Sequence, residues 1–241
     1  MRTGMRTETD PHCTSYAEAY GWSMRILIAG GHGKIALLLS RQLADAGHEP
    51  VGIIRNPAQA ADIRAAGAVP LVLDLEHSTI DQVAAALAGA DATVFAAGAG
   101  ANSDADRKLT LDRDGAILLA DASVRAGVRR MIVVSSMGAD GFDADSDDVF
   151  QVYLRAKSEA DAAVRQRELD WTIVRPGALT DAEPTALVTV GKTVDRGSIP
   201  RADVAAIILA LLVDVSGVGS QFEVISGQTP LTEALAALPL D

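Results

Sequence analysis

The chain has 241 residues, of which 49% are apolar and 22% charged, and its formal net charge is −11. This length and composition predict one soluble domain that can bury a sizeable core. The acidic balance argues against nucleic acid or an anionic membrane surface as a partner, because both are recognised by basic faces. The single cysteine, Cys13, excludes an internal disulfide and fits a reducing cytoplasm, the expected location.

Two stretches bear on targeting. Residues 1–23 are polar and aperiodic and lack the apolar core of a secretory signal, so we expect a disordered N-terminal extension. The longest apolar run, Val204 to Val213, is far too short to span a bilayer and is expected to form a buried helix.

Strand-like and helix-like runs alternate from Met24 onward. Strands are expected at 25–29, 50–54, 69–73, 92–96, 130–135, 171–175 and 221–225. Helices are expected at 34–46, 58–66, 79–87 (with Ser78 as the N-cap), 106–126, 151–168, 201–213 and 231–238. The alternation predicts an α/β fold over residues 24–241, a single Rossmann-type domain with a doubly wound parallel sheet between two helix layers. Residues 178–241 would form a small C-terminal segment that shapes the substrate pocket.

The first predicted strand runs directly into a glycine-rich turn. Gly30, Gly31 and Gly33 precede the first helix, an arrangement that exposes backbone N–H groups and a helix N-terminus to a diphosphate. His32 and Lys34 add side-chain donors for phosphate. The motif fits two registers, G-x-x-G-x-x-A and G-x-G-x-x-A, and an ordinary strand-to-helix turn is the alternative interpretation.

The ends of the next two strands indicate the cofactor type. Arg55 stands where an NAD site would place an acidic residue for the ribose 2′-hydroxyl. A guanidinium there can pair with a 2′-phosphate, which predicts a preference for NADP(H) over NAD(H). The alternative for Arg55 is a solvated charge at a strand end. Asp74 could accept a hydrogen bond from the adenine amino group or cap the segment that follows it.

A third set of residues predicts the chemistry. Tyr153 and Lys157 are four apart and share a helix face, and Ser135 and Ser136 end the preceding strand. An ammonium favours the phenolate form of a neighbouring tyrosine, which can then exchange a proton with a carbonyl or hydroxyl group. The alternatives are a tyrosine that only packs its ring, a lysine on a solvated helix face, and serines that only satisfy strand-end backbone groups.

With these motifs the chain resembles the short-chain dehydrogenase/reductase superfamily. More narrowly, it resembles the small atypical NAD(P)H-binding members that include biliverdin reductase B (flavin reductase) and NmrA-like proteins. The resemblance covers Met24 to the C-terminus and depends on the segments 29–36, 126–138, 153–159, 170–180 and 199–205, together with Arg55.

The resemblance implies a catalytic set of Ser136, Tyr153 and Lys157. Cofactor contacts are expected from Gly30, Gly31, His32, Gly33, Lys34, Ile35, Arg55, Asp74, Leu75, Ala97, Gly98, Ser135, Lys157, Pro176 and Gly177. One departure is Asp112, which stands where many relatives have an asparagine. It weakens any proton relay through that helix.

Two further features have less specific interpretations. Asp140 to Asp148 contains five aspartates and is interpreted as a mobile solvated loop, with a lid that disfavours anionic substrates as the alternative. Asp203 is interpreted as a helix-start residue. The histidines and the cysteine lack metal-ligand spacing, so no metal is expected.

The predicted function is NADPH-dependent reduction of a small carbonyl, quinone or flavin-like substrate, by a monomer or homodimer. The alternative is a non-catalytic NADP(H) redox sensor of the NmrA-like kind. A sugar-nucleotide epimerase or dehydratase is disfavoured, because only about 65 residues follow the sixth predicted strand.

Overall fold

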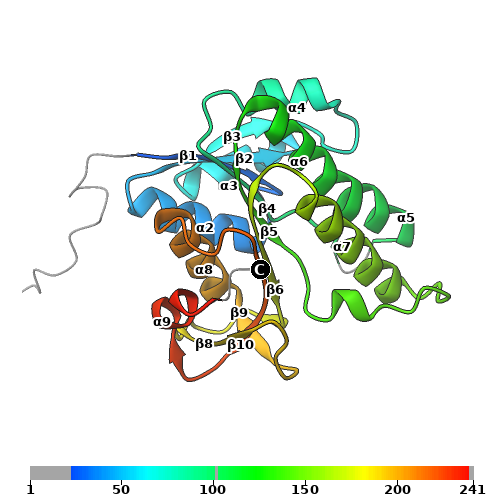
Figure 1. The fold of residues 1–241 in the computed structure, drawn as a ribbon. Helices are drawn as coiled ribbons and strands as arrows, with labels where there is room; N and C mark the ends of the chain where they lie inside the picture. The colour runs from blue at the N-terminus through cyan, green and yellow to red at the C-terminus, as the bar shows by residue number, and fades with distance from the viewer. Residues whose placement is uncertain (1–22, 101–102, 239–241) are drawn as a thin grey trace, which may run out of the picture.

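The computed structural model describes residues 23–100 and 103–238, and these form a sheet with helices on both faces (Figure 1). The expected extension at 1–23 therefore lies outside the described residues, except for Ser23. Within the described residues the sheet has nine strands in the order β11-β8-β10-β6-β5-β4-β1-β2-β3. Seven of them are parallel: β1 Arg25–Ala29, β2 Glu49–Ile54, β3 Val69–Val72, β4 Ala92–Phe95, β5 Arg130–Val134, β6 Asp170–Pro176 and β10 Ser220–Ser226. The Rossmann-type α/β fold is thereby confirmed.

Alternate residues of β1 pack on opposite faces of this sheet, because successive strand side chains point to opposite sides. Ile26 and Ile28 join the core under α2 (Lys34–Asp45), α8 (Arg201–Val213) and α9 (Leu231–Ala236). Leu27 and Ala29 join the core under α4 (Ile80–Ala86), α6 (Asp114–Ala126) and α7 (Val149–Arg165). All four side chains are fully buried, which explains why β1 is apolar from Ile26 to Ala29. Figure 1 shows the two helix layers on either side of the sheet.

The strand order places a crevice at the carboxyl end of β1. β1 pairs with β2 on one side and with β4 on the other, so the chain moves outward from β1 in both directions. Loops that leave the carboxyl ends of neighbouring strands diverge at such a switch point, where ligands of doubly wound sheets bind. The glycine turn lies at this point.

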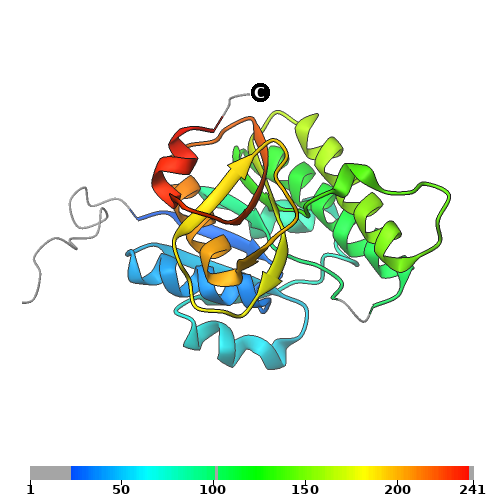
Figure 2. The ribbon, with the colours of Figure 1, turned by 90° about the horizontal axis from the view of Figure 1, so that it is seen from below.

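The C-terminal part departs from the expected all-parallel sheet. β8 (Leu187–Gly191) runs antiparallel to β10, and β11 (Thr229–Pro230) pairs antiparallel with β8 (Figure 2). Within the stretch where no element was expected, β7 (Ala178–Thr180) also pairs with β9 (Ser198–Pro200) as a separate parallel ribbon. An antiparallel strand needs no crossover helix, so the usual strand–helix alternation gives no signal for it.

Three helix predictions need correction. The helix expected at 106–126 is divided into α5 (Ala105–Arg107), a π-helical turn η2 (Lys108–Arg113) and α6. The helix expected at 58–66 begins as a 3₁₀ turn, η1 (Pro57–Gln59), before α3 (Ala60–Ala65). Ser78 is not the N-cap of α4, because Thr79 forms a capping box with Gln82 while the Ser78 hydroxyl donates to the Asp74 carbonyl oxygen at 2.6 Å.

No helix among the described residues is long and apolar enough to cross a membrane.

Candidate functional site

The glycine turn presents backbone N–H groups at the start of α2. The Gly31 N–H donates to the Ile53 carbonyl oxygen at 2.9 Å, and the Gly33 N–H donates to that of Gly30 at 2.8 Å, which fixes the turn. Gly30 adopts φ +77°, a conformation that favours glycine. Gly33 is the N-cap of α2 and provides no side-chain cap. The first N–H groups of α2 are therefore available for an anion.

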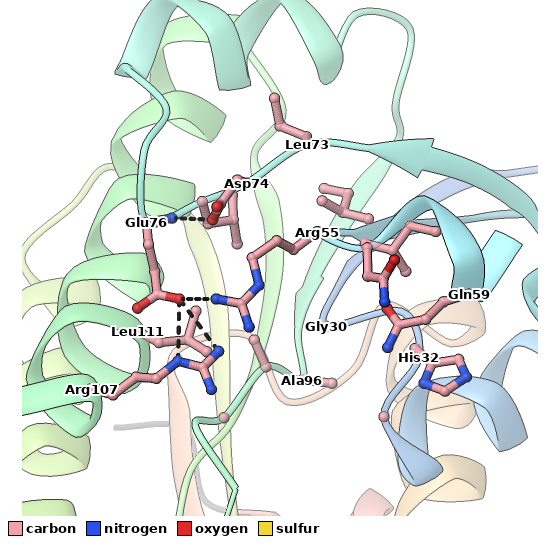
Figure 3. A pocket seen from close by; sticks show the side chains of 17 residues that line it. Gly30, His32, Arg55, Gln59, Leu73, Asp74, Glu76, Ala96, Arg107 and Leu111 are labelled. Carbon is pink, nitrogen blue, oxygen red and sulfur yellow. Dashed lines mark hydrogen bonds and ion pairs between the residues drawn. The ribbon is translucent and has the colours of Figure 1, made fainter. Parts of the chain in front are cut away.

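A cavity of about 390 Å³ opens beside this turn, along the carboxyl ends of β1, β2 and β4 (Figure 3). Eight of the predicted cofactor residues line it: Gly30, His32, Gly33, Arg55, Asp74, Leu75, Ala97 and Gly98. Its other lining residues are Ile53, Ile54, Asn56, Gln59, Leu73, Glu76, Ala96, Arg107 and Leu111. The structure thus brings together the residues predicted from the ends of four different strands, β1, β2, β3 and β4. Its volume lies in the range of ligand sites, and its backbone-lined floor fits the diphosphate and adenosine parts of a dinucleotide.

Two arginines converge on one carboxylate at the far side of the cavity (Figure 3). Arg55 Nη1 donates to Glu76 Oε2 at 3.0 Å, and Arg107 Nε and Nη2 donate to the same oxygen at 3.3 Å each. Thr110 Oγ1 donates to the other oxygen, Oε1, at 2.8 Å. The sequence analysis identified Arg55 but missed Glu76 and Arg107, because neither belongs to a local motif.

Asp74 caps the segment that follows β3, which is one of the two roles that the sequence left open. Its Oδ1 accepts from the Glu76 N–H at 3.0 Å and its Oδ2 lies 2.9 Å from His77 Nδ1, so it organises the turn after β3. It also lines the cavity, with 31% of its side chain exposed.

The two predicted phosphate donors of the glycine turn have carboxylate partners. His32 Nε2 lies 2.7 Å from Asp62 Oδ2, and Lys34 Nζ lies 2.5 Å from Asp181 Oδ2. Arg201 Nη1 donates to the other oxygen of Asp181 at 2.6 Å. The hydrogen bond from Lys34 lowers the pKa of Asp181. Exposed pairs of this kind contribute little to stability, so both donors can exchange partners at small cost.

The predicted catalytic residues lie at the carboxyl end of β5, against α7. The Tyr153 ring lies near two ammonium groups, with its centroid 5.4 Å from Lys108 Nζ and 5.9 Å from Lys157 Nζ. Lys108 comes from the π-helical turn η2, and sequence reasoning missed it. Single π-helical turns often occur at functional sites, because they bring side chains out of the regular helical pattern. The Phe150 ring lies 6.0 Å from that of Tyr153 and is exposed.

Lys157 is buried rather than solvated. Its Nζ donates to the Val134 carbonyl oxygen at 3.2 Å and lies 3.3 Å from Asp112 Oδ1. Burial by itself lowers the pKa of Lys157, but the charges of Asp112 and Asp161, together with Tyr153, raise it by more, so the pKa is raised. Lys157 therefore carries its positive charge beside Tyr153 at neutral pH.

Asp112 connects this lysine to the cavity. Its Oδ2 accepts from the Ala99 N–H at 3.0 Å, and its Oδ1 is so close to Gly98 that a Cβ there would lie 3.2 Å from it. The departure from the usual asparagine thus supplies the negative charge that holds Lys157.

Ser135 and Ser136 have different surroundings. Ser135 is buried, and its hydroxyl donates to Asp161 Oδ2 at 2.6 Å. Ser136 is half-buried and makes only a long contact, 3.4 Å, with the carbonyl oxygen of Met137. Ser136 is therefore the serine whose hydroxyl can turn toward a substrate.

An acidic and basic network lies behind the serines. Arg175 donates to Asp161 Oδ2 through Nε at 2.9 Å and to both oxygens of Asp140 at 2.6 and 2.8 Å. Ser158 Oγ also donates to Asp140, at 2.7 Å. Both ends of the segment from Asp140 to Asp148, which was predicted to be a mobile solvated loop, make defined contacts: Arg175 and Ser158 anchor Asp140, and Asp148 caps α7 through the N–H groups of Phe150 and Gln151.

The remaining predicted residues serve packing or have a single contact. Gly31 has no room for a Cβ, which would lie 2.6 Å from the Cα of Gly52. At Gly177 a Cβ would lie 2.4 Å from the Gly197 carbonyl oxygen, and the carbonyl oxygen of Pro176 accepts from the Met137 N–H at 3.0 Å. Ile35 is a buried residue in the first turn of α2. Asp203 lies in the first turn of α8, as expected, but its carboxylate also binds the N–H groups of Thr185 and Ala186.

Among residues 23–100 and 103–238, no group of three or more histidine, cysteine or acidic side chains could hold a metal ion.

Comparisons with known proteins agree with this geometry. A family model described as NAD(P)H-binding matches residues 30–214. The chain is 34% identical over 216 residues to a Bacillus subtilis protein named as the uncharacterized sugar epimerase YhfK, with 89% of this chain and 100% of that protein covered. It is 31% identical over 229 residues to UPF0659 protein C216.03 of Schizosaccharomyces pombe, which covers 87% of this chain and 93% of the relative.

Solved structures show the same fold. A Bacillus halodurans structure whose name assigns it to the NAD-dependent epimerases/dehydratases is 37% identical, with a TM-score of 0.81 and coverage of 89% of this chain and 99% of that one. The anaerobilin reductase ChuY of Escherichia coli O157:H7 is 24% identical, with a TM-score of 0.70 and coverage of 84% and 97%, and this likeness shows the fold alone. By the family match and these relatives, the chain belongs to the NAD(P)H-binding family.

Proposed function

We propose that this protein reduces a small carbonyl, quinone or flavin-like compound with NADPH. The observation that carries the proposal is the position of half-buried Tyr153, whose ring centroid lies 5.4 Å from Lys108 Nζ and 5.9 Å from Lys157 Nζ. A phenol next to two cations is suited to give up a proton, because both charges favour the phenolate that remains.

Each residue of this set has a distinct role in the proposal. Tyr153 donates the proton to the oxygen of the acceptor, Lys157 stabilises the phenolate, and Ser136 orients the acceptor through its hydroxyl. Asp112 keeps Lys157 charged and in place. Tyr153, Lys157 and Ser136 are the catalytic residues of this proposal, whereas Asp112 acts through Lys157 and is a positioning residue.

The cavity and the glycine turn fit the cofactor that the proposal requires. Backbone N–H groups at the start of α2 would hold the diphosphate, and Arg55 would pair with the 2′-phosphate of NADPH. When bound, the nicotinamide supplies the hydride. The short connection from Gly98 through Asp112 to Lys157 supports a reaction centre next to this cavity.

NADPH oxidation by the full chain with a panel of aldehydes, ketones, quinones and flavins tests the proposal. We expect turnover with at least one acceptor. For a carbonyl acceptor, the Tyr153→Phe substitution should lower kcat by about 100-fold or more without changing the Kd for NADPH. Unchanged kcat in Tyr153→Phe would exclude the tyrosine as proton donor.

A non-catalytic redox sensor is the competing function. The exposed Phe150, next to Tyr153, would suit contact with another protein as well as with a planar substrate. Tight binding of NADPH without turnover of any acceptor would favour the sensor over the reductase.

The names of two relatives favour a second enzymatic candidate, an epimerase or dehydratase that acts on sugars. Such enzymes regenerate their cofactor, so they would consume no NADPH overall. The C-terminal segment argues against a large sugar-nucleotide pocket, because most of its elements (β8, β10, α8 and α9) extend the main sheet or cover it. Product analysis with a sugar nucleotide, without net NADPH oxidation, would support this candidate instead.

A further inference from the structure

We propose that Arg107 is a specificity-determining residue that acts with Arg55, and that the two arginines form one seat for the 2′-phosphate of NADP(H), held together by Glu76. The inference rests on the proposed function for the use of NADPH, and it adds two residues that no local motif identifies.

The two guanidinium groups reach the seat from opposite sides of the cavity. Arg55 follows β2, whereas Arg107 ends α5 on the segment that follows β4. Figure 3 shows both side chains directed at Glu76, above Leu111. Because the Rossmann arrangement places the adenosine ribose at the end of the second strand, this convergence lies where a 2′-phosphate is expected.

The charges at this point favour an anion. Arg55, Arg107 and Glu76 together carry one positive charge, and the Asp74 carboxylate, which also lines the cavity, is bonded to the Glu76 N–H and to His77. Glu76 offsets the repulsion between the two cations and is itself rigid, with only 12% of its side chain exposed and its backbone N–H bonded to Asp74. The arginines are therefore positioned before any ligand arrives.

The carboxylate of Glu76 is largely occupied by contacts within the protein. An acidic residue near this position would select NAD(H) if it accepted a hydrogen bond from the 2′-hydroxyl. Here Oε2 already accepts three N–H groups and Oε1 accepts the Thr110 hydroxyl, so Oε2 is saturated and Oε1 keeps one lone-pair position. Glu76 thus organises the arginines.

The guanidinium of Arg55 keeps most of its donors available. Among the described residues its one hydrogen bond uses Nη1, and 53% of its side chain is exposed. A guanidinium has five N–H groups in a planar fork, which binds two oxygens of one phosphate. Arg107 donates to Glu76 through Nε and Nη2. Its Nη1 makes only a long contact, 3.4 Å, with the Ala99 carbonyl oxygen, and a phosphate can replace this contact.

Equilibrium binding of NADPH and NADH, at one fixed ionic strength, tests this inference. The proteins to compare are the full-length wild type, Arg107→Ala, Arg55→Ala and the control Arg64→Ala. Arg64 is exposed on α3 and is not among the residues that line the cavity. Its replacement by alanine therefore changes the net charge by the same amount as the other two substitutions but removes no contact of the two-arginine seat.

We expect the wild type to prefer NADPH. Either arginine substitution in the seat should raise the Kd for NADPH by roughly 10-fold or more and leave the Kd for NADH within about twofold, because only the charge-assisted bonds to the phosphate are lost. Arg64→Ala should change neither value. If Arg107→Ala weakens both dinucleotides equally, or neither, the inference is wrong.

Competition with fragments gives a second measurement on the unmodified protein. Adenosine 2′,5′-bisphosphate should displace NADPH at much lower concentration than adenosine 5′-monophosphate does, and equal potency would overturn the inference. The two failures remain distinguishable. A wild type that binds neither dinucleotide contradicts the proposed function, whereas one that binds both with a ratio insensitive to Arg107 contradicts only the seat.

Discussion

Lys157 Nζ lies 3.3 Å from Asp112 Oδ1, and only 4% and 1% of the two side chains are exposed. Asp112 belongs to the π-helical turn η2, and Lys157 to α7. The same aspartate holds the backbone of Ala99, so one buried ion pair links the cofactor cavity, the π-helical turn and the predicted catalytic helix. Loss of either partner leaves an uncompensated charge in the interior.

Substitution of Asp112 alone should therefore be far more damaging than replacement of both partners. We expect Asp112→Asn to lower the free energy of unfolding by about 3 kcal/mol, because the Lys157 ammonium loses its counter-charge. The double substitution Asp112→Leu with Lys157→Met should cost less than Asp112→Asn. Urea unfolding of the three proteins checks this order, and a double variant less stable than Asp112→Asn would contradict it.

Gly31 should tolerate no side chain, for a reason that is independent of the cofactor. A Cβ there would lie 2.6 Å from the Cα of Gly52, and neither backbone can move without disturbing β2. We expect Gly31→Ala to destabilise the protein by about 2 kcal/mol or more. Gly141→Ala is the control, because a Cβ at Gly141 has no neighbour within 4 Å. Thermal unfolding of the two variants without cofactor measures the difference between them. Equal Tm values for Gly31→Ala and Gly141→Ala would show that the glycine turn can adjust to a side chain.

Asp140 gives the protein an acid-sensitive contact. The hydrogen bonds from Arg175 lower the pKa of Asp140 from its ordinary value of 3.8 to about 2. Because the pKa is lower in the folded state, the stabilisation is complete above the ordinary value and is lost as pH falls toward 2.

The Asp140→Asn substitution should lower the free energy of unfolding by about 1 kcal/mol at pH 7, since water screens the half-exposed carboxylate. The difference from the wild type should shrink as the pH falls from about 4 to 2. Asp145→Asn, an exposed change in the same loop, should have no effect at either pH. Urea unfolding across this range provides the measurement, and a difference that does not depend on pH would exclude the ion pair as its cause.

The adjacent arginines 129 and 130 should differ sharply in their contribution to stability. Arg130 is buried and donates to the carbonyl oxygens of Asp170, Leu211 and Ser216 and to the Thr172 hydroxyl, at 2.7 to 3.1 Å. Burial lowers the pKa of Arg130 to about 10, so it stays charged at neutral pH.

We expect Arg130→Met to cost about 3 kcal/mol, because several buried acceptors lose their donor. Arg129→Met should cost less than about 1 kcal/mol, because Arg129 is 64% exposed and pairs with Asp170 at the surface. Chemical denaturation of both variants tests the contrast. Similar losses would mean that the buried hydrogen bonds of Arg130 contribute no more than a surface pair.

The fold could largely be predicted, because strand and helix signals are local. Residues Ile26 to Ala29 were predicted to form a buried strand, and the structure shows one. The glycines that were predicted to end helices, Gly47, Gly67 and Gly127, have the positive φ angles that glycine favours. The division of the helix at 106–126 could not be predicted, because its apolar spacing continues through η2 and the π-helical turn depends on packing against α7. The antiparallel strand β8 was not predicted, because it needs no crossover helix and so leaves no signal in the strand–helix alternation.

The amino-acid sequence by itself determined the strand–helix alternation, the glycine turn at the switch point and the positions of Arg55, Tyr153 and Lys157, since each follows from short-range pattern and chain direction. Only the tertiary structure decided the partners of the charged groups. Asp112 holds Lys157, Glu76 holds Arg55 and Arg107, and Asp140 is anchored by Arg175. The physical reason is that the free energy of a charge depends on its burial and on all neighbouring charges, and these come from segments that are distant in the chain.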